Sequence, residues 1–201
     1  MSDTAPADFA RTSQKLIDLL LRYIVPGGAL VLTFGALQPQ PFSAYRLSGT
    51  NEISQWLLLL GVAVGGPAIY SVHRALLHRM VQGLVFPIAK ALNRQPYGSL
   101  SSVTAVLLEV EGKRAIWRDS GAPWLSLYEE WSAQTHFLYC SCWGLLTAFA
   151  MHLGLATPLA DKGIWLSMAT AITLLLSAVV GDFRALVHQL ERPPTTASLS
   201  T

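Results

Sequence analysis

The sequence is poor in charged residues. Asp, Glu, Lys and Arg make up only 13% of its 201 residues, and hydrophobic residues make up 52%, whereas a soluble domain carries about 25% charged residues. So few charges cannot cover a water-exposed surface, which argues against an ordinary soluble protein. The formal net charge of +2 also gives no reason to expect direct binding of nucleic acid.

Motifs that carry catalytic chemistry are lacking as well. The chain has no G-x-S-x-G, H-E-x-x-H or P-loop motif, and the adjacent acids Glu129 and Glu130 diverge on a helix instead of converging as a catalytic pair. The two cysteines, Cys140 and Cys142, point to different helix faces and are expected to be reduced packing residues. We therefore predict a protein that is not an enzyme and has no catalytic residue, cofactor or metal site.

A haem b electron-transfer subunit is the least favoured alternative. His136 and His152 are 16 residues apart, which places them on nearly opposite faces of one helix and about 24 Å apart along its axis. Two haems stacked between the same helices would need both histidines on one face.

Long apolar segments dominate what the sequence does contain. A helix needs roughly 20 mainly apolar residues to cross a bilayer, and four windows have close to that length: 16–37, 56–72, 137–156 and 164–181. The predicted fold class is an all-α polytopic membrane protein with four transmembrane helices in two hairpins, joined by a cytosolic, mostly helical insertion.

The predicted organisation follows from these windows and the polar segments between them. The expected parts are a mobile N-terminal tail (1–13), a first transmembrane hairpin (14–79), a cytosolic connection (80–123), a helix that continues into a second hairpin (124–190) and a disordered C-terminal tail (191–201). Residues 102–118 fit either a short amphipathic helix or a strand hairpin, and we prefer the helix.

Pro26-Gly27-Gly28 and Gly65-Gly66-Pro67 interrupt the first two apolar windows. Such breaks let a neighbouring helix approach closely or expose backbone to a cavity, and close packing is the commoner outcome.

The distribution of lysine and arginine predicts the orientation. One side of the membrane, which also holds both termini, would carry Arg11, Lys15, Arg74, Arg79, Lys90, Arg94, Lys113, Arg114, Arg118, Arg184 and Arg192, and the other side only Arg46 and Lys162. We therefore expect both termini and the connection to be cytoplasmic.

Two short strings resemble each other, RALLH at 74–78 and RALVH at 184–188. Each follows a tryptophan, Trp56 or Trp165, by about the length of one span, so the two halves are either a tandem repeat or convergent products of membrane physics. A repeat would form a charged layer at the cytoplasmic face. Its candidate members are Arg74, His78, Asp182, Arg184, His188 and His136.

Three interpretations of this charged layer stay open: contacts with lipid headgroups, a pH- or lipid-responsive layer, or ligation of haem or metal. Two further candidate sites are a membrane-entry ion pair between Asp18 and Arg22, four residues apart on one helix, and a cluster of cations and tryptophans. This cluster would contact anionic lipid or a soluble protein, and its members are Lys113, Arg114, Trp117, Arg118 and Trp124.

The overall plan of about 200 residues, four spans, cytoplasmic termini and a cytosolic insertion between hairpins resembles small membrane subunits of bacterial anti-phage defence systems, including that of the Kiwa type. The resemblance concerns architecture and carries no functional residue over. It implies an inner-membrane homo-oligomer that works with a separately encoded soluble effector.

The functional hypothesis is therefore a non-enzymatic subunit of the bacterial inner membrane. It would oligomerise, contact anionic lipid, and sense membrane perturbation, recruit a cytosolic protein, or do both. The alternative is an oligomeric ion channel, because glycine-rich breaks and Arg22 lie in the first spans.

Overall fold

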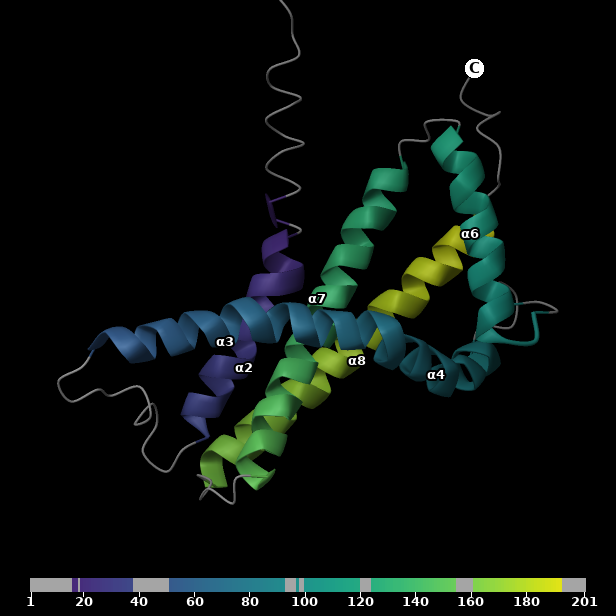
Figure 1. Ribbon diagram of the computed structural model, residues 1–201. Coiled ribbons are helices and arrows are strands. Elements are labelled where there is room, and N and C mark those ends of the chain that lie inside the picture. The colour runs from purple at the N-terminus through teal and green to yellow at the C-terminus, as the bar shows by residue number, and fades with distance from the viewer. Residues whose placement is uncertain are drawn as a thin grey trace, which may run out of the picture. The chain divides into compact units, whose positions relative to one another are not determined.

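The computed structural model of the chain is all α-helical over its described residues (Figure 1). These are 16–17, 19–37, 51–92, 97, 100–119, 124–154 and 161–192, with only the backbone described at 51–58, 126, 161 and 162. The helices are α2 (Val25–Ala36), α3 (Asn51–Val72), α4 (His78–Leu92), α6 (Val103–Asp119), α7 (Trp124–Gly154) and α8 (Asp161–Glu191), with π-helical turns η1 (Leu20–Ile24) and η3 (His73–Leu77). The predicted fold class is confirmed at this level.

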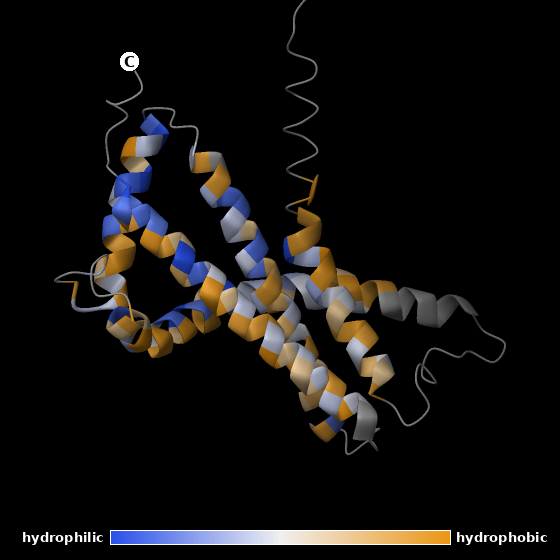
Figure 2. Cartoon of the chain, turned by 180° about the vertical axis from the view of Figure 1, so that it is seen from behind, coloured by the Kyte–Doolittle hydropathy of each residue, from blue (hydrophilic) through white to orange (hydrophobic). Residues whose placement is uncertain are grey.

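Two stretches of helix are long and apolar enough to cross a membrane, Leu127–Gly154 in α7 and Gly163–Glu191 in α8, and Leu20–Ala36 is a shorter apolar helix. Apolar residues extend along both long helices in Figure 2. In the most apolar window of α8 only 11% of the residues are buried, whereas the core helix of a soluble protein is mostly buried. This exposure favours a lipid environment for α8.

The described chain divides into two compact units. Unit 1 comprises residues 1–73 and 136–175, and unit 2 comprises residues 74–135 and 176–201. Helices α7 and α8 each contribute residues to both units without a break in the helix. The prediction of an unbroken helix from Trp124 into the third apolar window is confirmed.

Close helix packing in unit 1 depends on glycine. A Cβ atom at Gly27 would collide with the backbone of Val62, and one at Gly66 with the carbonyl of Tyr23. In α7, a Cβ at Gly144 would lie 2.8 Å from the carbonyl oxygen of Pro26. Small residues that let backbones meet are typical of membrane helix contacts, so close packing explains Gly27 and Gly66 in the two predicted breaks, whereas a Cβ at Gly28 would meet no atom within 4 Å.

A small apolar core in unit 1 lies between α7 and α8. Its buried members are Cys142, Leu145 and Ala171. Cys140 and Cys142 are both free thiols and fully buried. Their burial confirms the predicted packing role.

The core of unit 2 is formed by three helices and one connecting residue. Its buried members are Phe86 and Ala89 of α4, Tyr97, Val106 and Val110 of α6, and Phe183, Leu186 and Leu190 of α8. Helix α6 confirms the preferred interpretation of residues 102–118. Ser102 directly precedes this helix, and its Oγ accepts a hydrogen bond from the backbone N–H of Ala105 (3.2 Å), as a capping residue does.

Candidate functional site

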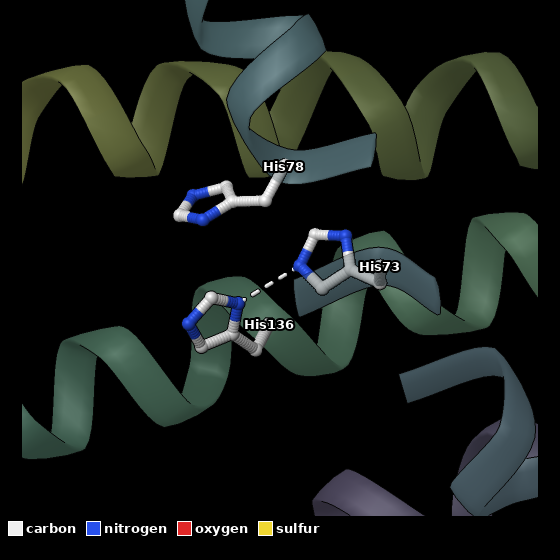
Figure 3. A group of neighbouring side chains, drawn as sticks. All are labelled: His73, His78 and His136. Atoms are coloured by element: carbon white, nitrogen blue, oxygen red, sulfur yellow. Dashed lines mark hydrogen bonds between the residues drawn. The ribbon is translucent and has the colours of Figure 1, made fainter. Parts of the chain in front are cut away.

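A chain of hydrogen bonds joins two buried histidines in unit 1. His73 in η3 and His136 in α7 point toward one another (Figure 3), with 2.9 Å between His73 Nε2 and His136 Nδ1. The indole Nε1–H of Trp143 donates to His73 Nδ1 at 3.1 Å. His73 is 0% exposed and His136 is 3% exposed, so bulk water does not compete for these bonds.

The donor at Trp143 fixes the protonation of both rings. An indole nitrogen only donates, so His73 Nδ1 accepts and carries no proton. A neutral His73 then holds its hydrogen on Nε2, which donates to His136 Nδ1, and His136 in turn holds its hydrogen on Nε2. A second proton on His73 would place an N–H at Nδ1, facing the N–H of Trp143. A second proton on His136 would likewise place an N–H at Nδ1, facing the N–H of His73. Protonation of either ring therefore breaks the chain of hydrogen bonds between η3 and α7.

Aromatic side chains surround the histidine pair. Tyr139 lies 5.0 Å from His73 between ring centroids, and Tyr70 contacts His136 edge-on at 6.1 Å. Tyr70 also accepts a hydrogen bond from Arg22 Nη1 at 3.3 Å on its hydroxyl. The histidine pair and the first apolar segment are therefore linked through one tyrosine.

Both π-helical turns contribute to this group, since Arg22 lies in η1 and His73 in η3. A π turn inserts an extra residue into a helix and re-aims the side chains next to it, and such turns are frequent at functional sites. Asp18, the predicted ion-pair partner of Arg22, lies outside the described residues, so that ion pair stays a prediction.

His152 is a separate buried histidine of unit 1. Its Nε2 lies 2.8 Å from the carbonyl oxygen of Phe34, and its ring stacks on the Phe34 ring at 4.4 Å. His136 and His152 therefore bond different helices, His136 toward η3 and His152 toward α2. A hydrogen bond from imidazole to a backbone carbonyl ties α7 to α2 at this end.

In unit 2 a carboxylate holds two side chains of α4. Asp182 Oδ2 lies 3.0 Å from His78 Nε2 and accepts a 2.9 Å hydrogen bond from Gln82 Nε2. His78 and Gln82 are four residues apart, so both project from one side of α4. The three side chains tie the start of α4 to α8.

Two of the six residues of the predicted charged layer are in contact with each other. His78 and Asp182 of that set bond each other, and Gln82 joins them. Three other members, Arg74, Arg184 and His188, are exposed in unit 2. The sixth, His136, bonds His73 in unit 1.

Of the predicted cation and tryptophan cluster, two cations hold α6 to the end of α8. Lys113 Nζ donates to the carbonyls of Leu190 and Arg192, and Arg114 Nε donates to Gln189 Oε1 at 2.5 Å. A lysine at the last carbonyls of a helix also complements the helix dipole. Burial lowers the pKa of the Arg114 guanidinium, which stays charged because an arginine pKa lies far above neutrality.

The tryptophans of this cluster pack within unit 2. Trp117 is fully buried and stacks on Tyr128 at 5.6 Å, with Trp124 edge-on at 6.3 Å. The guanidinium of Arg192 lies 5.1 Å above the Trp124 ring, a cation–π contact. Trp117 therefore lies in the interior and not on a contact surface. Arg118 is the one member of the predicted cluster that is exposed.

Sequence reasoning missed three residues of these sites: His73, Trp143 and Gln82. The signal for Gln82 was available, because it follows His78 by one helical turn. His73 and Trp143 become partners only through the packing of η3 on α7, which no local pattern indicates.

No family model, curated protein or solved structure matches the chain in the three comparisons made.

Proposed function

We propose that the protein is a non-enzymatic, oligomeric membrane subunit that relays a disturbance of the bilayer to a cytosolic protein. It would cross the inner membrane of a bacterium four times with both termini in the cytoplasm. The architectural resemblance makes anti-phage defence the biological setting of this hypothesis. A reporter fused after Thr201 is expected to be active in the cytoplasm, and an exported reporter would contradict the orientation.

One observation carries the proposal: α7 and α8 are both unbroken helices of 31 residues that contribute to both units. Each contains a stretch fit to cross a membrane, and the end of α8 supplies Phe183, Leu186 and Leu190 to the core of unit 2. An α-helix transmits an axial shift or rotation because its backbone hydrogen bonds resist bending. Displacing the spans is therefore expected to displace part of the unit 2 core.

The histidine chain supports a sensing role for unit 1. It links η3 to α7 through side chains that have one permitted pattern of donors and acceptors. A shift of α7 against η3 would break the chain as a whole, because His73 is both donor to His136 and acceptor from Trp143. Elements with two discrete arrangements are what conformational relays require.

Hydrogen exchange can test the relay. In vesicles whose lipids have shorter acyl chains, amide exchange in α6 should change in the native protein. His136→Leu should abolish that response, because it removes the acceptor for His73. His152→Leu is the matched control, since it removes a hydrogen bond from the same helix to Phe34 and should leave the response intact. Amide exchange in α6 of the native protein that does not change with bilayer thickness would contradict the relay.

Recruitment would use the outward face of α6. This face combines apolar Leu108 (70% exposed) and Ile116 (47% exposed) with charged Glu109, Glu111 and Arg118. Exposed apolar side chains within a charged surround are typical of protein contact sites. The buried side of α6 is occupied by the core of unit 2.

A pair of variants can test recruitment. Purified native protein in detergent should form a complex of defined stoichiometry with one cytosolic protein, measured as particle mass. Leu108→Asp with Ile116→Asp should abolish that complex, and Glu191→Lys, at an exposed site of α8, should keep it. Unchanged particle mass for the native protein after incubation with cytosol would count against the recruiting role.

An oligomeric channel is the second candidate. The feature that favours it is a group of polar side chains, Arg22, Tyr70, His73 and His136, within otherwise apolar helices. Ion flux across liposomes that contain the purified protein distinguishes the candidates: sustained conductance supports the channel, and sealed vesicles support the relay.

A further inference from the structure

The outward face of α4 is apolar except for one arginine near its start. Between residues 76 and 92 nine side chains or glycines are exposed, and eight of them are apolar or glycine: Leu76, Met80, Gly83, Leu84, Pro87, Ile88, Ala91 and Leu92. Leu84 is 74% exposed and Leu92 is 78% exposed. The ninth residue is Arg79. Figure 2 shows the apolar residues along this helix.

The polar residues of α4 other than Arg79 face the protein instead. His78 and Gln82 bond Asp182, and Lys90 donates to the carbonyl oxygen of Leu100. A helix on a water-exposed surface has the reverse pattern, with polar residues outward. Polar side chains that turn inward and satisfy one another, with large apolar side chains outside, are typical of a helix whose outward face contacts lipid.

The exposed residues of α8 give a second, independent indication of the surroundings at the start of α4. Within unit 2 the exposed positions of α8 change from Leu176, Ser177 and Val180, none of them charged, to Arg184, His188 and Glu191. Asp182 lies at this change, and it is the residue that His78 and Gln82 of α4 bind. The first turn of α4 is therefore at the level where α8 passes from apolar to polar surroundings.

Charge identifies the kind of lipid. The sequence contains no Asp or Glu between Glu52 and Glu109, whereas α4 presents Arg79 outward. Basic amphipathic helices with no acidic residue bind the interface of anionic leaflets through both apolar burial and charge attraction.

We propose that α4 is an interfacial helix whose outward face is embedded in a leaflet of anionic lipid. Leu84, Ile88 and Leu92 enter the outer part of the acyl region, and Arg79 binds phosphate groups of the lipids. The occupant of this face is thus the bilayer, and the inference does not depend on the proposed relay. It also moves α4 from the predicted cytosolic connection to the membrane surface.

Single-cysteine labelling can test this inference in the full-length protein. Leu84→Cys or Ile88→Cys on α4, and Leu108→Cys or Ile116→Cys on α6, would be labelled with a polarity-sensitive fluorophore. All four sites are exposed, so the changes leave the core intact. Unsubstituted protein checks that buried Cys140 and Cys142 do not react. The probes are vesicles of phosphatidylcholine with or without phosphatidylglycerol, each also prepared with spin-labelled lipid.

Labels on α4 should emit at shorter wavelength than labels on α6, and spin-labelled lipid should quench them at least about twofold more strongly, as expected of a helix at acyl depth. Phosphatidylglycerol should increase the difference, and Arg79→Gln should remove that increase. Equal quenching on α4 and α6 would overturn the proposal. Disulfide formation between Leu84→Cys copies in vesicles would overturn it too, because a second copy would then cover the face.

Discussion

Helices α4 and α6 pack on the same core of unit 2, but their outward faces are made of different residues. Phe86 of α4 and Val106 of α6 are buried in that core. Outward, α4 presents apolar residues and one arginine, whereas α6 presents both kinds: apolar Leu108, Gly112, Ala115 and Ile116, and polar Thr104, Glu109, Glu111, Arg118 and Asp119. The inward face of each helix is dictated by the shared core, and the outward face reports the solvent, lipid for α4 and water for α6.

The largest expected effect tests whether the inward face of α4 belongs to the core. Phe86→Ala should destabilise unit 2 by about 3–5 kcal/mol, the usual cost of removing a buried phenyl ring. Leu84→Ala is the control, because Leu84 is 74% exposed. Hydrogen exchange of α6 and the end of α8 in detergent would measure both. Greater destabilisation by Leu84→Ala than by Phe86→Ala would mean that α4 packs with the opposite face.

The next prediction compares the outward faces directly. In vesicles, Ile88→Asp on α4 should cost about 2–3 kcal/mol, the order of the penalty for a charge placed among lipid chains. Leu108→Asp on α6 should change stability by no more than about 0.5 kcal/mol, as for ordinary surface substitutions. Exchange rates of unit 2 amides give both values. A small penalty at Ile88 would place α4 in water, like α6.

A smaller effect is expected at the link between α4 and α8. Asp182→Asn weakens the bonds from His78 and Gln82, and loss of hydrogen bonds to a charged acceptor costs about 1–3 kcal/mol. Exchange should accelerate in the first turns of α4 and stay unchanged in α6, which is held to α8 by Lys113 and Arg114 instead. Uniform acceleration in both helices would show that Asp182 stabilises the whole unit.

The sequence predicted the helices well, because their signals are local. Apolar length predicted the long helices α7 and α8, and the spacing of Val103, Val106 and Val110 favoured α6 as a helix. Two of the four predicted spans correspond to helices that are long and apolar enough to cross a membrane. The apolar pattern of α4 was also visible, but a periodic pattern alone does not say whether the apolar stripe faces a core or a bilayer.

The candidate sites were predicted less completely, because they depend on contacts between distant segments. Charge and repetition pointed to His78 and Asp182, which do meet. His136, which the same reasoning grouped with them, bonds His73 in unit 1, and its place in the charged layer stays a prediction. Burial of Trp117 could not be inferred, since a tryptophan beside cations occurs both at surfaces and in aromatic cores.

The last and smallest effect concerns Tyr97, which α4 and α6 enclose together. Its ring meets Phe86 edge-on at 5.4 Å, and its buried hydroxyl has no hydrogen-bond partner among the described residues. Burial, and secondarily the charge of Asp182, raise the pKa of Tyr97 from 10.0 to about 12.

The folded protein therefore keeps the proton of Tyr97 at pH values where the unfolded chain releases it. This contribution to stability is complete below pH 10 and is lost as the pH rises toward about 12. Ultraviolet titration should show one late-ionising tyrosine that Tyr97→Phe removes, and that variant should flatten the alkaline loss of stability. At neutral pH the variant should change stability by less than about 1 kcal/mol, because an unpartnered hydroxyl contributes no bond. Ionisation of Tyr97 near pH 10 would mean that water reaches the core beneath α4. The inward face of α4 would then not be shielded from water, and its contrast with the outward face would not hold.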